Sequence, residues 1–260
     1  MGEISSQTYY QRFNQSEPID KSFKTFEKQN KWGVKDQQGR VIIKPKYDLL
    51  AFVRSGIIYA KLQGKKGLID LNEKIVIPFG KYNEIYSFQN GRAIVKKNKL
   101  SGVIDQNAKE IVPCIYKSAD YFRFNLCNVT NIHNKQGIID ISGAVVVPII
   151  YDKLIDMWDV GMLKAKKNGK WGCIDYHNEE LIEFNYDFIT RPSNEMIAVK
   201  QKNKFGLYNI YGIQVFPCVY DTIYSFSNGK AAVIKEGKWG YILLNGTEKI
   251  FDIKAKKHIK

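Results

Sequence analysis

The sequence predicts an all-β fold built from seven four-stranded antiparallel units of about 35 residues each. A glycine recurs every 34 or 35 residues, and turn residues separate runs of β-branched and aromatic residues every 8 to 10 positions, which is typical of strands. Consecutive apolar residues such as Leu68 and Ile69 follow this marker glycine, so both faces of that strand need covering. The marker glycines are Gly33, Gly67, Gly102, Gly137, Gly172, Gly206 and Gly240.

Each unit reads as four segments in order. A Tyr-Asp segment comes first, as in residues 220–226, and a Gly-x-Ala-x-Val-x-Lys strand follows, as in residues 229–235. The third strand carries the marker, as in residues 238–242, and the fourth is an apolar run ending at proline, as in residues 145–148. The Pro-x-x-Tyr link after it has no hairpin signal and is predicted to join one unit to the next.

The turns between these segments are chemically specified. Gly or Asn stands three residues before the marker in every copy except the third, where Lys99 replaces it, and both residue types tolerate the positive φ of a tight hairpin. We therefore expect the second and third strands to pair. Asp36 with Gly39, and Asp140 with Gly143, fit the first and fourth positions of a type I turn that pairs the third and fourth strands.

A sheet of 35 residues cannot bury its own faces, so neighbouring units must stack on one another. Seven copies fall in the usual range of about four to eight propeller blades, so the sequence favours a seven-bladed β-propeller. The alternative is an open β superhelix, because 35 residues is short for a blade of ~40 to 45. Predicted boundaries are an N-terminal extension (1–8), one repeat domain (9–251) and a basic C-terminal tail (252–260). Tyr9, Tyr10 and Phe13 match the first copy only loosely.

Composition excludes several classes of protein. With 44% hydrophobic residues the chain can form a core, and its longest apolar runs, about eight residues, are far short of a membrane span of ~20. The N-terminus lacks the basic and apolar regions of a signal peptide, and the four cysteines form no CxxC pair. We expect a monomer with reduced thiols in the cytoplasm; an exported protein with a trimmed leader stays open. The cysteines are Cys114, Cys127, Cys173 and Cys218.

Three sequence motifs of the repeat resemble the WG-repeat family of bacterial proteins. They are Lys-Trp-Gly-x-Ile-Asp, Val-Val-x-Pro-x-x-Tyr-Asp and Phe-x-x-Gly-x-Ala-x-Val. The best matches are residues 169–175, 144–152 and 226–241, whereas Lys66, Ser101 and Gln136 stand where tryptophan is expected. The resemblance implies a repeat scaffold and no shared catalytic residues.

Catalytic and metal motifs are absent from the sequence. It contains no GxSxG, no HExxH and no phosphate-binding glycine loop. Five copies have an aspartate three residues after the marker, without a second carboxylate at ligand spacing, so we expect it to accept turn N–H groups and not to bind calcium. We expect the tryptophans to fill the space between sheets. No cofactor or metal is predicted, and an enzyme with a hidden axial pocket is the least favoured alternative.

The net charge of +14 is concentrated in the hairpin turns. The six residues before each marker together hold 17 lysines and two acids, a net +15, so 14 minus 15 leaves −1 for the other residues. This predicts a basic face that attracts an anionic polymer or surface (nucleic acid, acidic polysaccharide or anionic lipid), or lysines that serve only solubility. The predicted basic face comprises Lys65, Lys66, Lys96, Lys97, Lys99, Lys135, Lys167, Lys170, Lys202, Lys204, Lys235 and Lys238.

Three consecutive units depart from the Phe-x-x-Gly turn, and packing does not explain these departures. Aromatic and arginine side chains replace it, and such residues are favoured in protein-binding hot spots. Our first functional hypothesis is therefore a non-catalytic scaffold that binds another protein. The candidate partner patch is Tyr121, Arg123, Phe124, Trp158 and Arg191.

Overall fold

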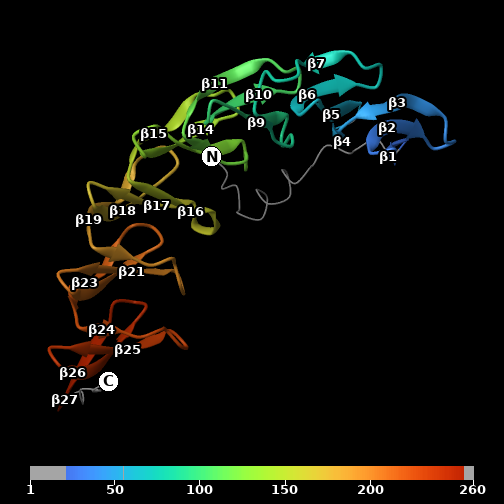
Figure 1. Cartoon of the computed structure of the whole chain (residues 1–260). Coiled ribbons are helices and arrows are strands. Elements are labelled where there is room, and N and C mark those ends of the chain that lie inside the picture. The colour runs from blue at the N-terminus through green and yellow to red at the C-terminus, as the bar shows by residue number, and fades with distance from the viewer. Residues whose placement is uncertain (1–21, 55, 255–260) are drawn as a thin grey trace, which may run out of the picture. The chain divides into compact units, whose positions relative to one another are not determined.

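The computed structural model describes residues 22–54 and 56–254, which form consecutive antiparallel sheets (Figure 1). The first sheet contains β1 (Phe23–Lys28), β2 (Lys31–Asp36) and β3 (Val41–Tyr47). The second contains β4 (Leu49–Arg54), β5 (Ile57–Leu62), β6 (Lys65–Asp70) and β7 (Ile75–Ile77). The third contains β8 (Glu84–Ile85), β9 (Arg92–Lys97), β10 (Leu100–Asp105) and β11 (Glu110–Tyr116). The fourth contains β12 (Ser118–Ala119), β13 (Leu126–Thr130), β14 (Gln136–Asp140) and β15 (Val145–Tyr151).

The remaining sheets follow the same plan. The fifth contains β16 (Lys153–Met157), β17 (Met162–Lys167), β18 (Lys170–Ile174) and β19 (Glu180–Tyr186), with the 3-10 helix η1 (Trp158–Val160) between its first two strands. The sixth contains β20 (Phe188–Ile189), β21 (Met196–Gln201), β22 (Lys204–Asn209) and β23 (Gln214–Tyr220). The seventh contains β24 (Thr222–Ile223), β25 (Lys230–Lys235), β26 (Lys238–Leu243) and β27 (Glu248–Lys254).

Every sheet is a meander in chain order, so the predicted all-β fold of repeated antiparallel units is confirmed. Six sheets have four strands, and the first has three within the described residues. The repeat unit is therefore propeller-like. The predicted extension (1–8) and the loose first match at Tyr9, Tyr10 and Phe13 lie outside the described residues. The last strand continues to Lys254, and residues 255–260 are also outside them.

The chain divides into two compact units between Val145 and Val146, at the start of β15. Within the described residues, the first unit holds the strands from β1 to β14 and the second those from β16 to β27.

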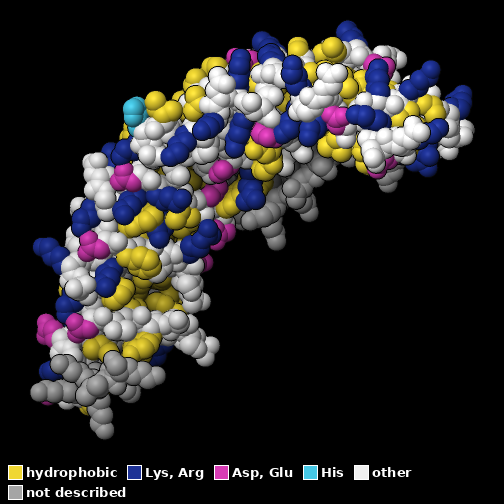
Figure 2. Space-filling view, in the orientation of Figure 1, with side chains coloured by type: hydrophobic (Ala, Val, Ile, Leu, Met, Phe, Trp, Pro, Cys, Tyr) yellow, Lys and Arg dark blue, Asp and Glu magenta, His cyan; other side chains and the backbone are white. Residues whose placement is uncertain are grey.

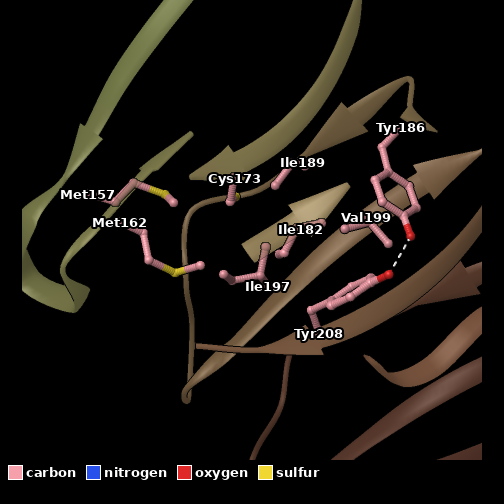
Figure 3. Packing of buried hydrophobic residues seen from close by; sticks show 9 residues of the cluster. All are labelled: Met157, Met162, Cys173, Ile182, Tyr186, Ile189, Ile197, Val199 and Tyr208. Carbon is pink, nitrogen blue, oxygen red and sulfur yellow. Dashed lines mark hydrogen bonds between the residues drawn. The ribbon is translucent and has the colours of Figure 1, made fainter. Parts of the chain in front are cut away.

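The core lies between consecutive sheets, as the stacking argument predicts. In the first unit, Ile69 packs with residues of the first sheet, whereas its neighbour Leu68 packs with residues of the third. Side chains on β6 therefore join two separate clusters on opposite faces. In the second unit one such cluster combines fifth-sheet residues, among them Met157 and Cys173, with sixth-sheet residues such as Tyr208 (Figure 3).

The last strand of several sheets differs from the prediction that it ends at proline. Strand β15 continues through Pro148 to Tyr151, and Pro113 and Pro217 lie inside β11 and β23 in the same way. Each of these strands is the last in its sheet, where a residue without an N–H group removes no ladder hydrogen bond. Units therefore join after the tyrosine and not at the Pro-x-x-Tyr link.

The predicted hairpins between second and third strands are confirmed. At the β9–β10 and β21–β22 turns, Asn98, Lys99, Lys202 and Asn203 have φ between 47° and 67°, and each turn has two residues. Two successive positive φ values define a type I′ turn. The β13–β14 connection is the exception: Thr130 pairs with Gln136 across five residues.

Candidate functional site

The twelve lysines of the predicted basic face lie in or beside the turns between second and third strands. Those exposed to solvent are Lys65, Lys97, Lys99, Lys170 and Lys202. The others are partly buried: Lys66, Lys96, Lys135, Lys167, Lys204, Lys235 and Lys238. Lysine and arginine side chains are interspersed with acidic ones in the view of Figure 2.

Carboxylates from neighbouring segments neutralise several of these lysines. The distances from ammonium nitrogen to carboxylate oxygen are 2.5 Å for Lys66–Glu84, 2.5 Å for Lys170–Asp187, 3.0 Å for Lys235–Glu248 and 2.7 Å for Lys238–Asp252. Lys204 pairs with Asp221 in the same manner. All five acids lie outside the six-residue windows in which the sequence places the positive charge. The turns are therefore less basic than the sequence arithmetic implies.

The aspartate that follows the repeated tyrosine links two sheets. Asp187 accepts a hydrogen bond from Lys170 in the fifth sheet and another, at 3.1 Å, from the backbone N–H of Lys202 in the sixth. The Lys170 hydrogen bond holds the pKa of Asp187 below its usual value. Asp48 and Asp221 accept from the turn N–H groups of Gly64 and Gly237 in the same way, each at 3.0 Å.

Part of the basic face has no carboxylate partner within the described residues. Lys65, Lys97, Lys99 and Lys202 form no ion pair there and are exposed. Lys97 and Lys99 stand on either side of Asn98 at the β9–β10 turn. Lys97 and Lys99 are thus the most concentrated exposed positive charge that the prediction retains.

The candidate partner patch is divided between the two compact units. Tyr121, Arg123 and Phe124 lie together at the turn before β13 in the first unit; Tyr121 is 51% exposed and contacts Tyr86 edge-on at 6.2 Å. Arg123 is exposed and Phe124 is partly buried. In the second unit Trp158 is partly buried in η1.

The fifth patch residue, Arg191, is exposed and stands two residues after Ile189, which binds a buried lysine that the sequence prediction missed. Lys164 on β17 is only 8% exposed; its ammonium donates to the Ile189 carbonyl and lies 4.4 Å from the Trp171 ring centre and 5.0 Å from that of Phe188. Burial lowers the pKa of Lys164, and the positive charge of Arg191 lowers it further. Lys164, Trp171, Phe188 and Arg191 are called the Lys164 cluster below.

One signal in the sequence could have identified Lys164. It stands eight residues before its marker, where other copies carry uncharged residues. These are Thr25, Tyr59, Ile94, Val129, Ala198 and Ala232.

The repeated aspartates and tyrosines act in turns and packing. Asp140 accepts from the N–H groups of Ser142 and Ala144 at 2.8 and 3.0 Å, and the hydrogen bond from the Ser142 hydroxyl is the main cause that lowers its pKa. The buried Tyr151 donates to Asn178 Oδ1 of the next sheet at 2.6 Å. The expected turn role of the aspartates is therefore confirmed.

The tryptophans and cysteines occupy different depths. Trp32 and Trp171 are partly buried and pack against the clusters between sheets. Trp239 is also partly buried and stacks on Tyr224 at 5.7 Å. All four cysteines are free thiols. Burial raises the pKa of Cys127 and of Cys173 to about 12, so neither is a ready nucleophile.

No group of three or more His, Cys, Asp or Glu side chains that could hold a metal ion is found among residues 22–54 and 56–254. Over the same residues, no helix is long and apolar enough to cross a membrane.

Comparison with known proteins identifies the repeat. The family described as "WG containing repeat" matches residues 32–65, 67–100, 102–130, 137–171, 171–205 and 205–239. A comparison with curated proteins finds no match.

Similar solved structures share little sequence with this chain. A eukaryotic initiation factor is 10% identical, with 76% of this chain and 62% of that chain covered and a TM-score of 0.41, so this chain spans less than two thirds of its length. BamB from Moraxella catarrhalis is 11% identical, with 91% and 87% covered and a TM-score of 0.32. Hsv2p from Kluyveromyces lactis is 9% identical, with 85% and 88% covered and a TM-score of 0.33.

Proposed function

The chain belongs to the WG containing repeat family, and from that premise we propose that it is a non-catalytic scaffold that binds another protein. The observation that supports this is the contrast between repeated and divergent positions. Repeated aspartates and tyrosines are engaged in turn and packing contacts such as those of Asp140 and Tyr151. The turns that depart from the repeat instead present exposed side chains, among them Tyr121, Arg123 and Arg191.

A variant of the β12–β13 turn tests this proposal. The purified chain is used to capture partners from the native organism, and the dissociation constant of the captured protein is then measured with Tyr121→Ser/Arg123→Ser. We expect it to rise about tenfold or more, because aromatic and arginine anchors contribute most of such binding energy. The matched control is Tyr211→Ser, which removes a 73% exposed tyrosine from the β22–β23 turn. Equal affinity of wild type and double variant would contradict the assignment.

A second candidate function is binding of an anionic polymer, which the exposed Lys97 and Lys99 favour. Lysine contacts to a polyanion release counterions, so affinity should fall by orders of magnitude between about 50 and 200 mM salt. A single-stranded oligonucleotide and polyglutamate are suitable probes, with Lys97→Gln/Lys99→Gln as the variant. Only six of the forty basic residues are arginine, so we expect no base-specific reading of nucleic acid. Affinity that is insensitive to salt and to the variant would exclude this candidate.

We also propose that the protein is a monomer in a reducing compartment such as the cytoplasm. The free state of Cys114, Cys127, Cys173 and Cys218 supports the compartment. Cell fractionation and light scattering of the purified chain test the two statements separately.

A further inference from the structure

The junction between the fifth and sixth sheets carries a buried positive charge that the repeat does not require. Lys164 pairs with Cys173, the residue after the marker, and the equivalent position in the third sheet holds Ile94, which is 4% exposed and packs in the core. Lys164 is 8% exposed at the same position. Because a buried cation costs desolvation free energy that an apolar residue does not, packing gives no reason for lysine here.

Lys164 also lacks a counter-charge among the described residues. An ammonium group has three donors, and the one hydrogen bond of Lys164 goes to the neutral Ile189 carbonyl. Its other neighbours are the faces of Trp171 and Phe188, at 4.4 and 5.0 Å. These contacts stabilise the cation in place without neutralising it.

A second cation lies at the surface of the same cluster. Arg191 is exposed and stands two residues after Ile189, whose carbonyl accepts the Lys164 hydrogen bond, and its positive charge lowers the pKa of Lys164. Phe188, on which the Lys164 ammonium lies, is 47% exposed. The surface therefore presents a guanidinium and an aromatic ring above a buried ammonium, and a bound anion would relieve the repulsion between the two cations.

We propose that the Lys164 cluster binds a carboxylate on a protein partner, from an acidic residue that is followed by an apolar one. Arg191 receives the carboxylate through its planar pair of donors, Phe188 packs against the apolar side chain, and Lys164 adds positive potential from beneath. This inference rests on the proposed scaffold function and names the chemistry of the partner.

The test uses the full chain and a capped peptide, acetyl-Gly-Glu-Phe-Gly-amide, with its glutamine analogue as the reference. Titration is followed by calorimetry and by tryptophan fluorescence, since Trp171 belongs to the cluster. We expect saturable binding of the glutamate peptide and about tenfold weaker binding of the glutamine peptide. Lys164→Met and Arg191→Gln should each weaken binding of the glutamate peptide about tenfold. Lys164→Met keeps the side-chain length and removes the buried charge, so thermal unfolding should show an intact fold.

The matched control is Lys109→Gln. Lys109 is an exposed lysine in the β10–β11 turn, outside the Lys164 cluster, so the variant removes one positive charge elsewhere on the chain. The control should bind the peptide as wild type does.

Several results would overturn the inference. One is equal affinity for the glutamate and glutamine peptides, and another is peptide binding that Lys164→Met leaves unchanged. A third is displacement of the peptide by inorganic phosphate at a lower concentration than by acetate. Capture of the native partner with equal affinity by wild type and Lys164→Met would reject the cluster as the site and leave the scaffold function standing. If wild type captures no partner, the scaffold function fails whatever the peptide result.

Discussion

A carbonyl of the outer strand crosses the marker glycine so closely that no side chain fits beneath it. A Cβ atom at Gly172 would lie 2.6 Å from the Ile182 oxygen and 3.0 Å from the Phe184 ring, and at Gly102 it would lie 2.6 Å from the Val112 oxygen. The crossing coincides with a register shift between β18 and β19. The same approach of an outer-strand carbonyl is found at the marker glycines of six sheets, so the glycine recurs because the backbone of the last strand is displaced over it.

Replacement of the marker should be far more costly than replacement of a turn glycine in the same hairpin. We expect Gly172→Ala to lower the free energy of unfolding by about 2 to 3 kcal/mol, because the new methyl group meets backbone that cannot move away. Gly169, with a φ of 81° and no neighbouring atom within 4 Å of a built Cβ, serves as the control. Gly169→Asn should cost no more than about 1 kcal/mol, since asparagine tolerates positive φ. Urea unfolding measures both, and similar losses would contradict the crossing argument.

At the scale of secondary-structure elements, neighbouring sheets are linked by aspartates that accept hydrogen bonds from the hairpin turns. Lys170 and Asp187 are 17 residues apart, and Asp187 also holds the turn N–H of Lys202. The sequence locates each turn, because Gly and Asn mark positive φ. It does not reveal that an acid from outside the turn returns to it, because that depends on how one sheet packs on the next.

These aspartates predict acid sensitivity. The pKa values of Asp48, Asp140, Asp187 and Asp221 are lowered in the folded state from 3.8. A carboxyl whose pKa is lower in the folded state than in the unfolded state stabilises the fold at pH values above its unfolded-state pKa. This stabilisation is lost as the pH falls through the folded-state pKa. Urea unfolding free energies should therefore decrease as pH falls below about 4.

Asp187→Asn isolates one of these groups. It should lose stability near pH 7, where the wild-type carboxylate is charged and paired, and should show a shallower decrease in acid than wild type. Asp159→Asn, at an exposed position in η1, controls for the loss of one negative charge. A pH profile of Asp187→Asn that is parallel to wild type would show that the pair adds nothing.

Prolines in the outer strands protect open edges. Pro217 is exposed within β23, the last strand of its sheet, where it presents no N–H group to another chain. We expect Pro217→Val to leave the free energy of unfolding within about 1 kcal/mol of wild type and to increase self-association. Light scattering over a concentration series measures this effect. If self-association of Pro217→Val equals that of wild type, the proline does not protect the strand edge and serves only the local geometry of the strand.

At the scale of the whole molecule, periodicity decides what the sequence can predict. The strand order, the hairpins, the cover on both faces of β6 and the turn role of Asp140 were predictable because each repeats and depends on near neighbours. The buried position of Lys164 was not predictable from the local sequence, because a lysine is expected to be exposed unless it is aligned with a buried residue such as Ile94 of the third sheet. Its contacts with Phe188 and Ile189 cross between sheets, so no local pattern records them.

A closed propeller and an open superhelix built from the same seven units differ in how compact the molecule is. Seven units in a closed propeller should scatter X-rays as a compact particle with a radius of gyration of about 18 Å, the value for a globular chain of 260 residues. Open stacking leaves the first and last sheets without a partner on one face and lengthens the particle, so the radius of gyration rises and the distance distribution becomes skewed. Small-angle scattering of the monomer at several concentrations therefore separates the alternatives. A compact, symmetric distribution would support the propeller that the sequence favours, and an elongated one would replace it with the open superhelix.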